Sequence, residues 1–339
     1  MPLHKMHEPT YHGKPADAHT PKVLGKQALL RRYPWIKAAM LRAVSKNFPV
    51  AVTEEWSDLA GPTPEDPLLR QVLPDPRELI ALPGDLPDPV GDRAKSPVPW
   101  LVQKHSDRAL LLVTKRCQVY CRYCFRRDHS PGEQMDPSPA ELENAIQTAV
   151  HSGAHELILS GGDPLALTDE KLDGILNRVR PHFPILRIHS RAPITAPSRV
   201  TPGLISLLVT HRPIWMVVHA NHPSELGTGA RESLRLLTQA GIQVLNQSVL
   251  LRGVNDDAAV LADLSRELVQ LGVLPYYLHH TDPVPGNGHF RVDVHRGLAI
   301  HEALKQQLSG VALPAYVVDL PGGQGKIPVE EAHRKGMIG

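Results

Sequence analysis

Short apolar runs alternate with helical patterns along the last two thirds of this chain, and the alternation limits the possible folds. We predict strands at Ala109–Val113, Glu156–Leu159, Ile185–His189, Ile214–His219, Val244–Val249 and Leu274–His279. Strands that alternate with helices form βαβ units and a parallel sheet. Six such units are too few for a closed eight-stranded barrel. The sequence therefore predicts an α/β fold with an open partial barrel of the (βα)6 type.

Helical patterns fill the intervals between these runs, and one more follows the sixth run. They cover Pro139–His151, Asp169–Arg180, Thr201–His211, Ala230–Ala240, Asp257–Leu271 and Asp293–Leu308. In barrels of this kind the chemistry lies at the carboxyl ends of the strands. Functional side chains are therefore expected directly after the apolar runs.

The first hundred residues lack this alternation of strand and helix patterns. Residues 1 to about 25 are polar and aperiodic, which predicts disorder. Leu29–Phe48 carries apolar residues at helical spacing, and Pro49 ends the pattern. Ten prolines then interrupt the chain between Ala60 and Pro99. This stretch is either a linker or, as its length favours, a belt that packs over the following domain.

All three cysteines, Cys117, Cys121 and Cys124, lie in one C-x3-C-x2-C segment after the first predicted strand. Three thiolates suit zinc or an iron–sulfur cluster. Zinc would need a fourth ligand such as His129, but structural zinc sites usually combine two separate ligand pairs. In a four-iron cluster, three cysteines leave one iron free to bind the amine and carboxylate of a small molecule. The spacing therefore favours the cluster.

The composition excludes several classes of function. A net charge of +2 gives no electrostatic case for a nucleic acid or an anionic membrane as partner. No apolar run has the length of a membrane span, and the first residues lack the apolar core of a signal peptide. Three clustered thiols and no other cysteine fit a reducing compartment, which predicts a cytoplasmic protein.

Two glycine-containing segments follow apolar runs. Gly161, Gly162 and Asp163 come after the second predicted strand, where glycines allow a close approach of backbone to a ligand or make an ordinary turn. Lys326 lies in a glycine-rich loop after Ala315–Val318 that does not match a phosphate-binding P-loop. A lysine near a barrel mouth can bind pyridoxal phosphate (PLP). Taken alone, the residues favour a solvated loop lysine over that role.

Seven segments together resemble the lysine 2,3-aminomutase family, a group of radical S-adenosylmethionine (SAM) enzymes that also use PLP. The resemblance extends from about Asp66 to Pro328, and it is carried by Arg108–Val113, Cys117–Arg127, Leu159–Pro164, Asn246–Asp256, Leu274–Tyr277, Gly288–Arg291 and Asp319–Pro328. The partial (βα)6 barrel is also the architecture of radical SAM cores. The resemblance implies an N-terminal helical and proline-rich wrapping segment (1–100), a radical SAM core (101–310) and a C-terminal PLP-binding segment (311–339).

The resemblance also implies roles for individual residues. The three cysteines match the ligands of a [4Fe–4S] cluster. Lys326 matches the lysine that binds PLP covalently, and Arg126 matches the arginine that binds the substrate carboxylate. Asp282 and Asp319 match two aspartates that bind the distal ammonium of lysine. Gly161, Gly162 and Asp163 match residues that contact SAM, and Asp163 replaces the commoner Glu. Arg108 matches an arginine that pairs with the PLP phosphate. Ser190 and Gln247 are two further implied cofactor-binding residues.

The implied activity is a 2,3-amino shift that converts L-lysine to β-lysine, with electrons from a cellular reductant such as flavodoxin or ferredoxin. Alternatives are the same chemistry in the β-lysylation of elongation factor P, or another substrate such as arginine. A zinc-binding scaffold that recruits a partner is the alternative of a different class. The chain ends about a dozen residues after Lys326 and lacks the cysteines that bind structural zinc in clostridial-type members, so their oligomer is not implied.

Overall fold

The computed structural model describes residues 21–127, 134–322 and 325–338. Most of the segment predicted to be disordered, and His129, lie outside the described residues.

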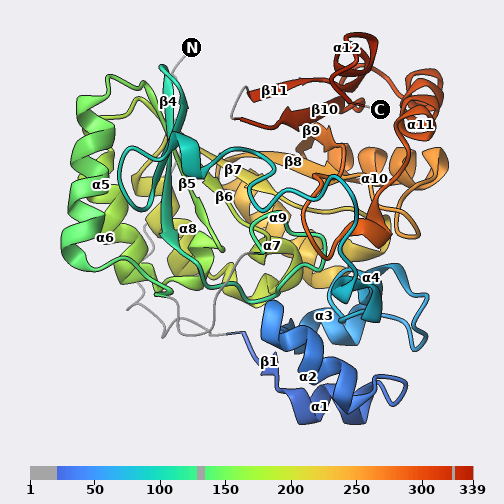
Figure 1. The fold of residues 1–339 in the computed structure, drawn as a ribbon. Helices are drawn as coiled ribbons and strands as arrows, with labels where there is room; N and C mark the ends of the chain where they lie inside the picture. Colours follow the sequence, from blue (N-terminus) through green and yellow to red (C-terminus); the bar gives the residue numbers. More distant parts are fainter. Residues whose placement is uncertain (1–20, 128–133, 323–324, 339) are drawn as a thin grey trace, which may run out of the picture.

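A single curved sheet of nine strands forms the centre of the described fold (Figure 1). Its strands are β3 (Leu101–His105), β4 (Arg108–Thr114), β5 (Glu156–Gly161), β6 (Ile185–His189), β7 (Ile214–Val218), β8 (Gln243–Val249), β9 (Val273–His279), β10 (Ala315–Leu320) and β11 (Gly325–Pro328). They lie side by side in the order β11-β10-β9-β8-β7-β6-β5-β4-β3. The strands from β4 to β10 are parallel, and β3 and β11 pair antiparallel at the two edges. In the described residues the two edge strands do not pair with each other, so the sheet is a partial barrel that is nearly closed. It confirms the predicted α/β fold.

Six of the seven parallel strands coincide with the predicted ones, with ends that differ by two residues at most. The apolar run before Lys326 forms the seventh, β10. The sequence interpretation missed both edge strands. Strand β3 ends in polar residues, and its two-residue hairpin at Ser106 and Asp107 is the signal that could have revealed it.

Helices follow most of the parallel strands and lie outside the curved sheet (Figure 1). The main ones are α5 (Pro139–His151), α6 (Asp169–Val179), α8 (Pro202–Thr210), α9 (Thr228–Gln239), α10 (Ala258–Gln270) and α11 (Val294–Gln307), with short α7 (Ala192–Thr195) and α12 (Val329–Arg334). Local sequence sets their starts, because Ser138, Thr168, Thr201, Asp257 and Asp293 each cap the first turn with a side-chain oxygen.

Four short helices and a two-stranded ribbon precede the barrel. They are α1 (Lys26–Arg32), α2 (Ala38–Asn47), α3 (Glu54–Leu59) and α4 (Pro67–Arg70), with β1 (Val23–Leu24) paired to β2 (Val52–Thr53). A continuous helix over Leu29–Phe48 was therefore a wrong prediction. The chain breaks between α1 and α2 at Pro34, which cannot donate a helical hydrogen bond.

Two large hydrophobic clusters support the sheet. The first joins the N-terminal helices, through residues such as Leu29 and Trp56, to the strands from β3 to β9. The second is built mainly on β10, α10 and α11, and includes Leu278, Tyr316 and Val318. The cysteine segment therefore lies over the first cluster, whereas Lys326 lies beside the second.

The proline-rich stretch lies against the barrel and the cysteine segment. Glu78 is buried and pairs with Arg122 at 2.6 Å and also with Arg127. Further along, Leu86 N donates to Pro283 O at 2.8 Å. The division of the chain at residues 100 and 310 stays a prediction.

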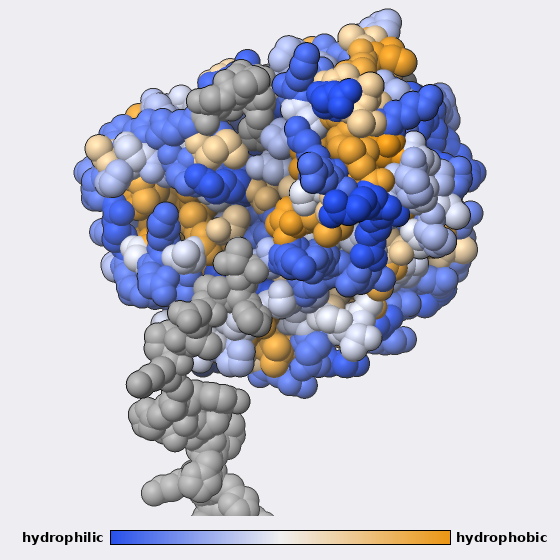
Figure 2. Space-filling model, turned by 90° about the horizontal axis from the view of Figure 1, so that it is seen from below, coloured by the Kyte–Doolittle hydropathy of each residue, from blue (hydrophilic) through white to orange (hydrophobic). Residues whose placement is uncertain are grey.

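No helix in the described part of the chain has the length and apolarity of a membrane span. Figure 2 shows a face on which hydrophilic residues surround smaller apolar areas.

Replacing Glu78 by Gln should destabilise the protein strongly, since it leaves the fully buried Arg122 without its counter-charge. Breaking a buried ion pair costs roughly 3–5 kcal/mol. Urea unfolding would measure the loss. Glu143→Gln is the matched control, because Glu143 pairs with Arg178 at the surface and its removal should leave stability nearly unchanged. Equal midpoints for wild type and Glu78→Gln would contradict this account.

Candidate active site

A cavity of about 640 Å³ lies inside the partial barrel. Residues from β3, β4, β5, β6, β8, β9, β10 and β11, the cysteine segment and the proline-rich stretch all contribute to its walls. Almost every residue singled out from the sequence lines this one cavity: Arg108, Cys117, Cys121, Cys124, Arg126, Gly161, Gly162, Asp163, Gln247, Asp282, Asp319 and Lys326. Ser190 lies behind the wall and donates to Asp163 Oδ1 at 2.6 Å.

The three cysteines are free thiols that lie partly buried after β4. Backbone contacts fix their loop: Cys124 N donates to Cys121 O at 3.0 Å, and Arg122 N donates to Gln71 O at 2.7 Å. Burial raises the pKa of Cys124 to about 11, and the neighbouring Cys121 adds to this effect. Burial likewise raises the pKa of Cys117. Such thiols ionise readily only when a metal binds them, so the set fits an iron–sulfur cluster.

Within the described ranges, no three His, Cys, Asp or Glu side chains converge to hold one metal ion. A four-iron cluster does not need such convergence, because each thiolate binds a different iron.

Gly161 and Gly162 allow β5 to pack directly against the start of the cysteine loop. Gly161 has φ +125°, and a Cβ there would lie 2.1 Å from Thr114 O. A Cβ on Gly162 would lie 2.3 Å from Arg116 O. These glycines thus allow a close contact between two protein backbones, and their contact with SAM stays a prediction.

Asp163 is buried, and its carboxylate caps the turn after β6. It accepts hydrogen bonds from Ser190 Oγ, from Arg191 N at 2.9 Å and from Ala192 N at 3.1 Å. Burial raises its pKa despite these donors. Both oxygens therefore have protein partners, and a contact between Asp163 and SAM stays a prediction.

The opposite side of the cavity holds Lys326 and two carboxylates. Lys326 lies in β11 directly across from Asp319 in β10, and its Nζ is 2.8 Å from Asp319 Oδ2. The expectation of a loop lysine was wrong, because Gly325–Pro328 pairs with β10 along its length. Burial opposes ionisation of Asp319, but Lys326 outweighs it and lowers the pKa. Burial, and then the Asp319 charge, raises the pKa of Asp282 to about 7.

Arg126 lies between these two sides and is held by Asp92, which sequence reasoning missed. Arg126 Nη2 is 2.8 Å from Asp92 Oδ2, and Lys104 Nζ is 2.8 Å from Asp92 Oδ1. Burial opposes the ionised form, yet Arg126 and Lys104 lower the pKa of Asp92 to about 2. Asp92 lies in the aperiodic proline-rich stretch, where no local pattern indicates a cavity residue.

Comparisons with known proteins agree with this geometry. Residues 111–264 match the model of the radical SAM superfamily. The L-lysine 2,3-aminomutase of Clostridium subterminale is 40% identical over 84% of this chain and 69% of its own length. That of Escherichia coli is 40% identical over 85% of each chain.

The chain belongs to the lysine 2,3-aminomutase family.

The resemblance recognised from the motifs is thereby confirmed. This member of the family spans only about two thirds of several relatives, such as 63% of the Fusobacterium nucleatum protein, which is 41% identical. Among solved structures, Streptococcus suis SuiB with its precursor peptide superposes with a TM-score of 0.49 at 13% identity, over 64% of this chain and 49% of that chain.

Three partly buried histidines line the cavity of this aminomutase-family chain: His189 ends β6, His219 follows β7 and His279 ends β9. Burial lowers their pKa, to about 4 for His219 and about 3 for His279, so both are neutral at pH 7. The sequence interpretation singled out none of these three histidines as a site residue. The missed signal is that each of the three ends an apolar run that forms a strand.

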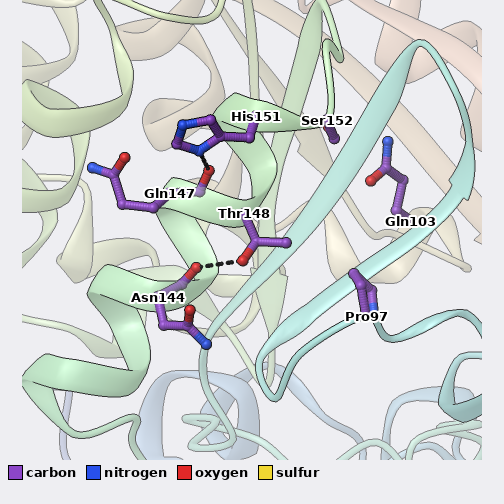
Figure 3. A pocket seen from close by; sticks show the side chains of 7 residues that line it. All are labelled: Pro97, Gln103, Asn144, Gln147, Thr148, His151 and Ser152. Atoms are coloured by element: carbon purple, nitrogen blue, oxygen red, sulfur yellow. Dashed lines mark hydrogen bonds between the residues drawn. The ribbon is translucent and has the colours of Figure 1, made fainter.

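A second hollow, of about 550 Å³, lies outside the barrel beside β3 and α5 (Figure 3). Its hydrogen bonds, such as Thr148 Oγ1 to Asn144 O at 2.7 Å, are internal to α5. It lacks the converging charged groups of the barrel cavity, so the barrel cavity is the candidate active site.

The raised pKa of Asp282 predicts a pH-dependent cost of folding in cofactor-free protein. The stability is complete below the ordinary pKa of 3.8 and falls as the pH rises toward about 7, because the ionised form is buried. Asp282→Asn removes this cost, so its stability advantage over wild type should grow by roughly 3–4 kcal/mol between pH 4 and pH 8.

Urea unfolding at several pH values measures this difference. Asp263→Asn, at an exposed surface pair, should show no such growth. Parallel pH profiles for wild type and Asp282→Asn would reject the burial of an ionising carboxyl at this position.

Proposed function

We propose that the protein is an isomerase that converts L-lysine to β-lysine by a 2,3-amino shift, with a [4Fe–4S] cluster, SAM and PLP as cofactors. The observation that carries the proposal is that one cavity has three free thiols on one side and a lysine with two carboxylates on the other. Membership of the family supports the same reaction.

The lining residues suit the three cofactors. Cys117, Cys121 and Cys124 would hold the cluster, and Lys326 would hold PLP, with Arg108 available to the phosphate as a planar cationic donor. Gln247 lines the same cavity and Ser190 supports its wall through Asp163. When bound, the cluster and SAM supply a carbon radical that removes a substrate hydrogen, and PLP supplies a conjugated ring that supports nitrogen migration.

The charges of the cavity favour a diamino acid. Asp282 and Asp319 present two partly buried carboxylates, whose charges are costly without a cation nearby. In the structure Lys326 partners Asp319. Lys326 would hold PLP through its amine, and the ε-ammonium of a lysine substrate would provide the two carboxylates with a cation. Arg126 would bind the substrate carboxylate, and its Nε and Nη2 donate to Asp92 Oδ2, which would orient it.

The reductant and the fate of the product are finer parts of this proposal. A flavodoxin or a ferredoxin would supply the electron, and β-lysine would be released or passed to elongation factor P. Two carboxylates would also accept the guanidinium of arginine, so arginine is the competing substrate.

An anaerobic assay tests the function directly. Protein reconstituted with iron and sulfide is reduced with dithionite and incubated with SAM, PLP and one amino acid at a time. We expect β-lysine from L-lysine, and far less product from arginine or glutamate. Turnover of arginine alone would reassign the substrate, and failure to take up iron would reject the cluster.

Lys326→Ala should abolish covalent PLP binding and lysine turnover, because it removes the amine that would bond the cofactor. Borohydride reduction followed by peptide mapping should label Lys326 in wild type. Lys335→Ala is the control, since Lys335 is exposed on the surface and pairs with Glu331. Label found on another lysine would refute the assignment.

Asp319→Asn should raise the KM for lysine at least about tenfold, because one charge-assisted contact contributes roughly 1.5–3 kcal/mol. The rate should also fall, since the β-carbon loses its alignment. The KM and rate for norleucine, which lacks the distal amine, should change little. Kinetics with both substrates check this, with Asp263→Asn as control. Unchanged kinetics in both Asp319→Asn and Asp282→Asn would rule out the ammonium site.

A further inference from the structure

We infer that Arg191 is a positioning residue that tunes the reduction potential of the cluster through a hydrogen bond to Cys121, and that Glu225 opposes its charge. This inference rests on the proposed function, because it concerns the cluster that Cys121 would help to bind.

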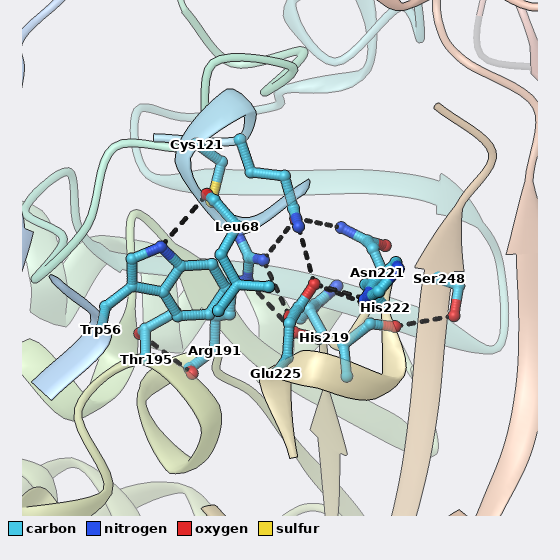
Figure 4. Close-up of polar contacts among 12 residues, drawn as sticks. Trp56, Leu68, Cys121, Arg191, Thr195, His219, Asn221, His222, Glu225 and Ser248 are labelled. Atoms are coloured by element: carbon cyan, nitrogen blue, oxygen red, sulfur yellow. Dashed lines mark hydrogen bonds and ion pairs between the residues drawn. The ribbon is translucent and has the colours of Figure 1, made fainter. Parts of the chain in front are cut away.

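The guanidinium of Arg191 has protein partners on all three nitrogens (Figure 4). Nη1 donates to Cys121 Sγ at 2.8 Å. Nε donates to His219 O at 3.1 Å, and Nη2 donates to Gln71 Oε1 at 2.6 Å and to Glu225 Oε2 at 3.0 Å. These bonds fix the guanidinium of Arg191 in one orientation, in which Nη1 faces the sulfur of Cys121.

Two aromatic rings hold the plane of this guanidinium. Its Cζ lies 4.9 Å from the centre of the Trp56 ring and 5.5 Å from that of Tyr123. The side chain is only 8% exposed. A guanidinium stays protonated in proteins, and Glu225 balances its charge at 3.0 Å. A permanent cation is therefore fixed in a water-poor place beside a cluster ligand.

Glu225 is the counter-charge, and it too is fixed. Its Oε1 accepts hydrogen bonds from Gln71 Nε2 at 2.8 Å and from the backbone nitrogens of Asn221 and His222. Gln71 comes from the N-terminal segment, and its own carbonyl accepts from Arg122 N in the cysteine loop. The same residues that position Arg191 therefore also position the loop that carries Cys121.

Reduction adds one negative charge to a cluster. A cation and an N–H donor at a ligand sulfur stabilise that charge and raise the reduction potential, whereas a nearby anion lowers it. Arg191 and Glu225 should therefore act with opposite signs. A purely structural role would not separate the two residues in this way.

The test is a redox titration of the reconstituted cluster without SAM, in which electron paramagnetic resonance monitors the reduced fraction. The variants are Arg191→Met, Arg191→Lys and Glu225→Gln. Arg199→Met is the matched control, because Arg199 is a buried arginine that bonds the carbonyls of Leu165 and Leu167 and does not line the cavity.

We expect a lower midpoint potential for Arg191→Met, a smaller decrease for Arg191→Lys, a higher potential for Glu225→Gln and no shift for Arg199→Met. If Arg191→Met binds no iron, the opposite shifts of Arg191→Lys and Glu225→Gln decide the question. Unmoved potentials, or shifts in one direction for both residues, would overturn the inference. So would weaker SAM binding by Arg191→Met at an unchanged potential.

A wild-type protein that takes up no iron and sulfide would instead reject the proposed function, and this inference with it.

Discussion

Parallel pairing from β4 to β10 is the constraint on which the cavity depends. Because parallel strands all end at the same edge, residues more than two hundred positions apart, such as Cys117 and Lys326, line one space. Several strands also supply site residues directly, such as Gln247 in β8, Asp319 in β10 and Lys326 in β11. Together the strands set the separation between a thiol-rich side and a carboxylate-rich side, with Arg126 between them.

The cavity contains groups that are costly when isolated, and each is paired. Asp92 pairs with both Arg126 and Lys104, Asp319 pairs with Lys326, and Arg191 pairs with Glu225. Asp282 differs from these carboxylates, because burial and then the charge of Asp319 raise its pKa to about 7 although Lys326 and Lys104 act in the opposite direction. A site with one carboxylate poised to gain a positive partner is consistent with a cationic substrate.

Local periodicity explains what could be predicted from the sequence. Strands and helices of the barrel have clear periods of two and 3.6 residues, and the cysteine motif is local, so both were found. Asp92, Arg191 and Glu225 were missed because they are paired with residues distant in the chain: Asp92 with Arg126, 34 residues away, and Arg191 with Glu225 and Gln71, 34 and 120 residues away. The roles of Asp282 and Arg126 came from the family resemblance, since nothing in their immediate sequence distinguishes them from a turn residue and a surface cation.

The two hydrophobic clusters give the active site two separate supports. The thiol side lies over the larger cluster, which includes the N-terminal helices, whereas Lys326 and Asp319 belong to a hairpin on the smaller one. The two ends of the cavity are thus mechanically distinct. Changes in the packing around β10 can alter the end of the cavity that holds Lys326 and Asp319, and under the proposed function the choice of substrate, while the end that holds the cysteines keeps its geometry. An architecture of this kind allows one radical chemistry to be retained while the range of amino acids diversifies.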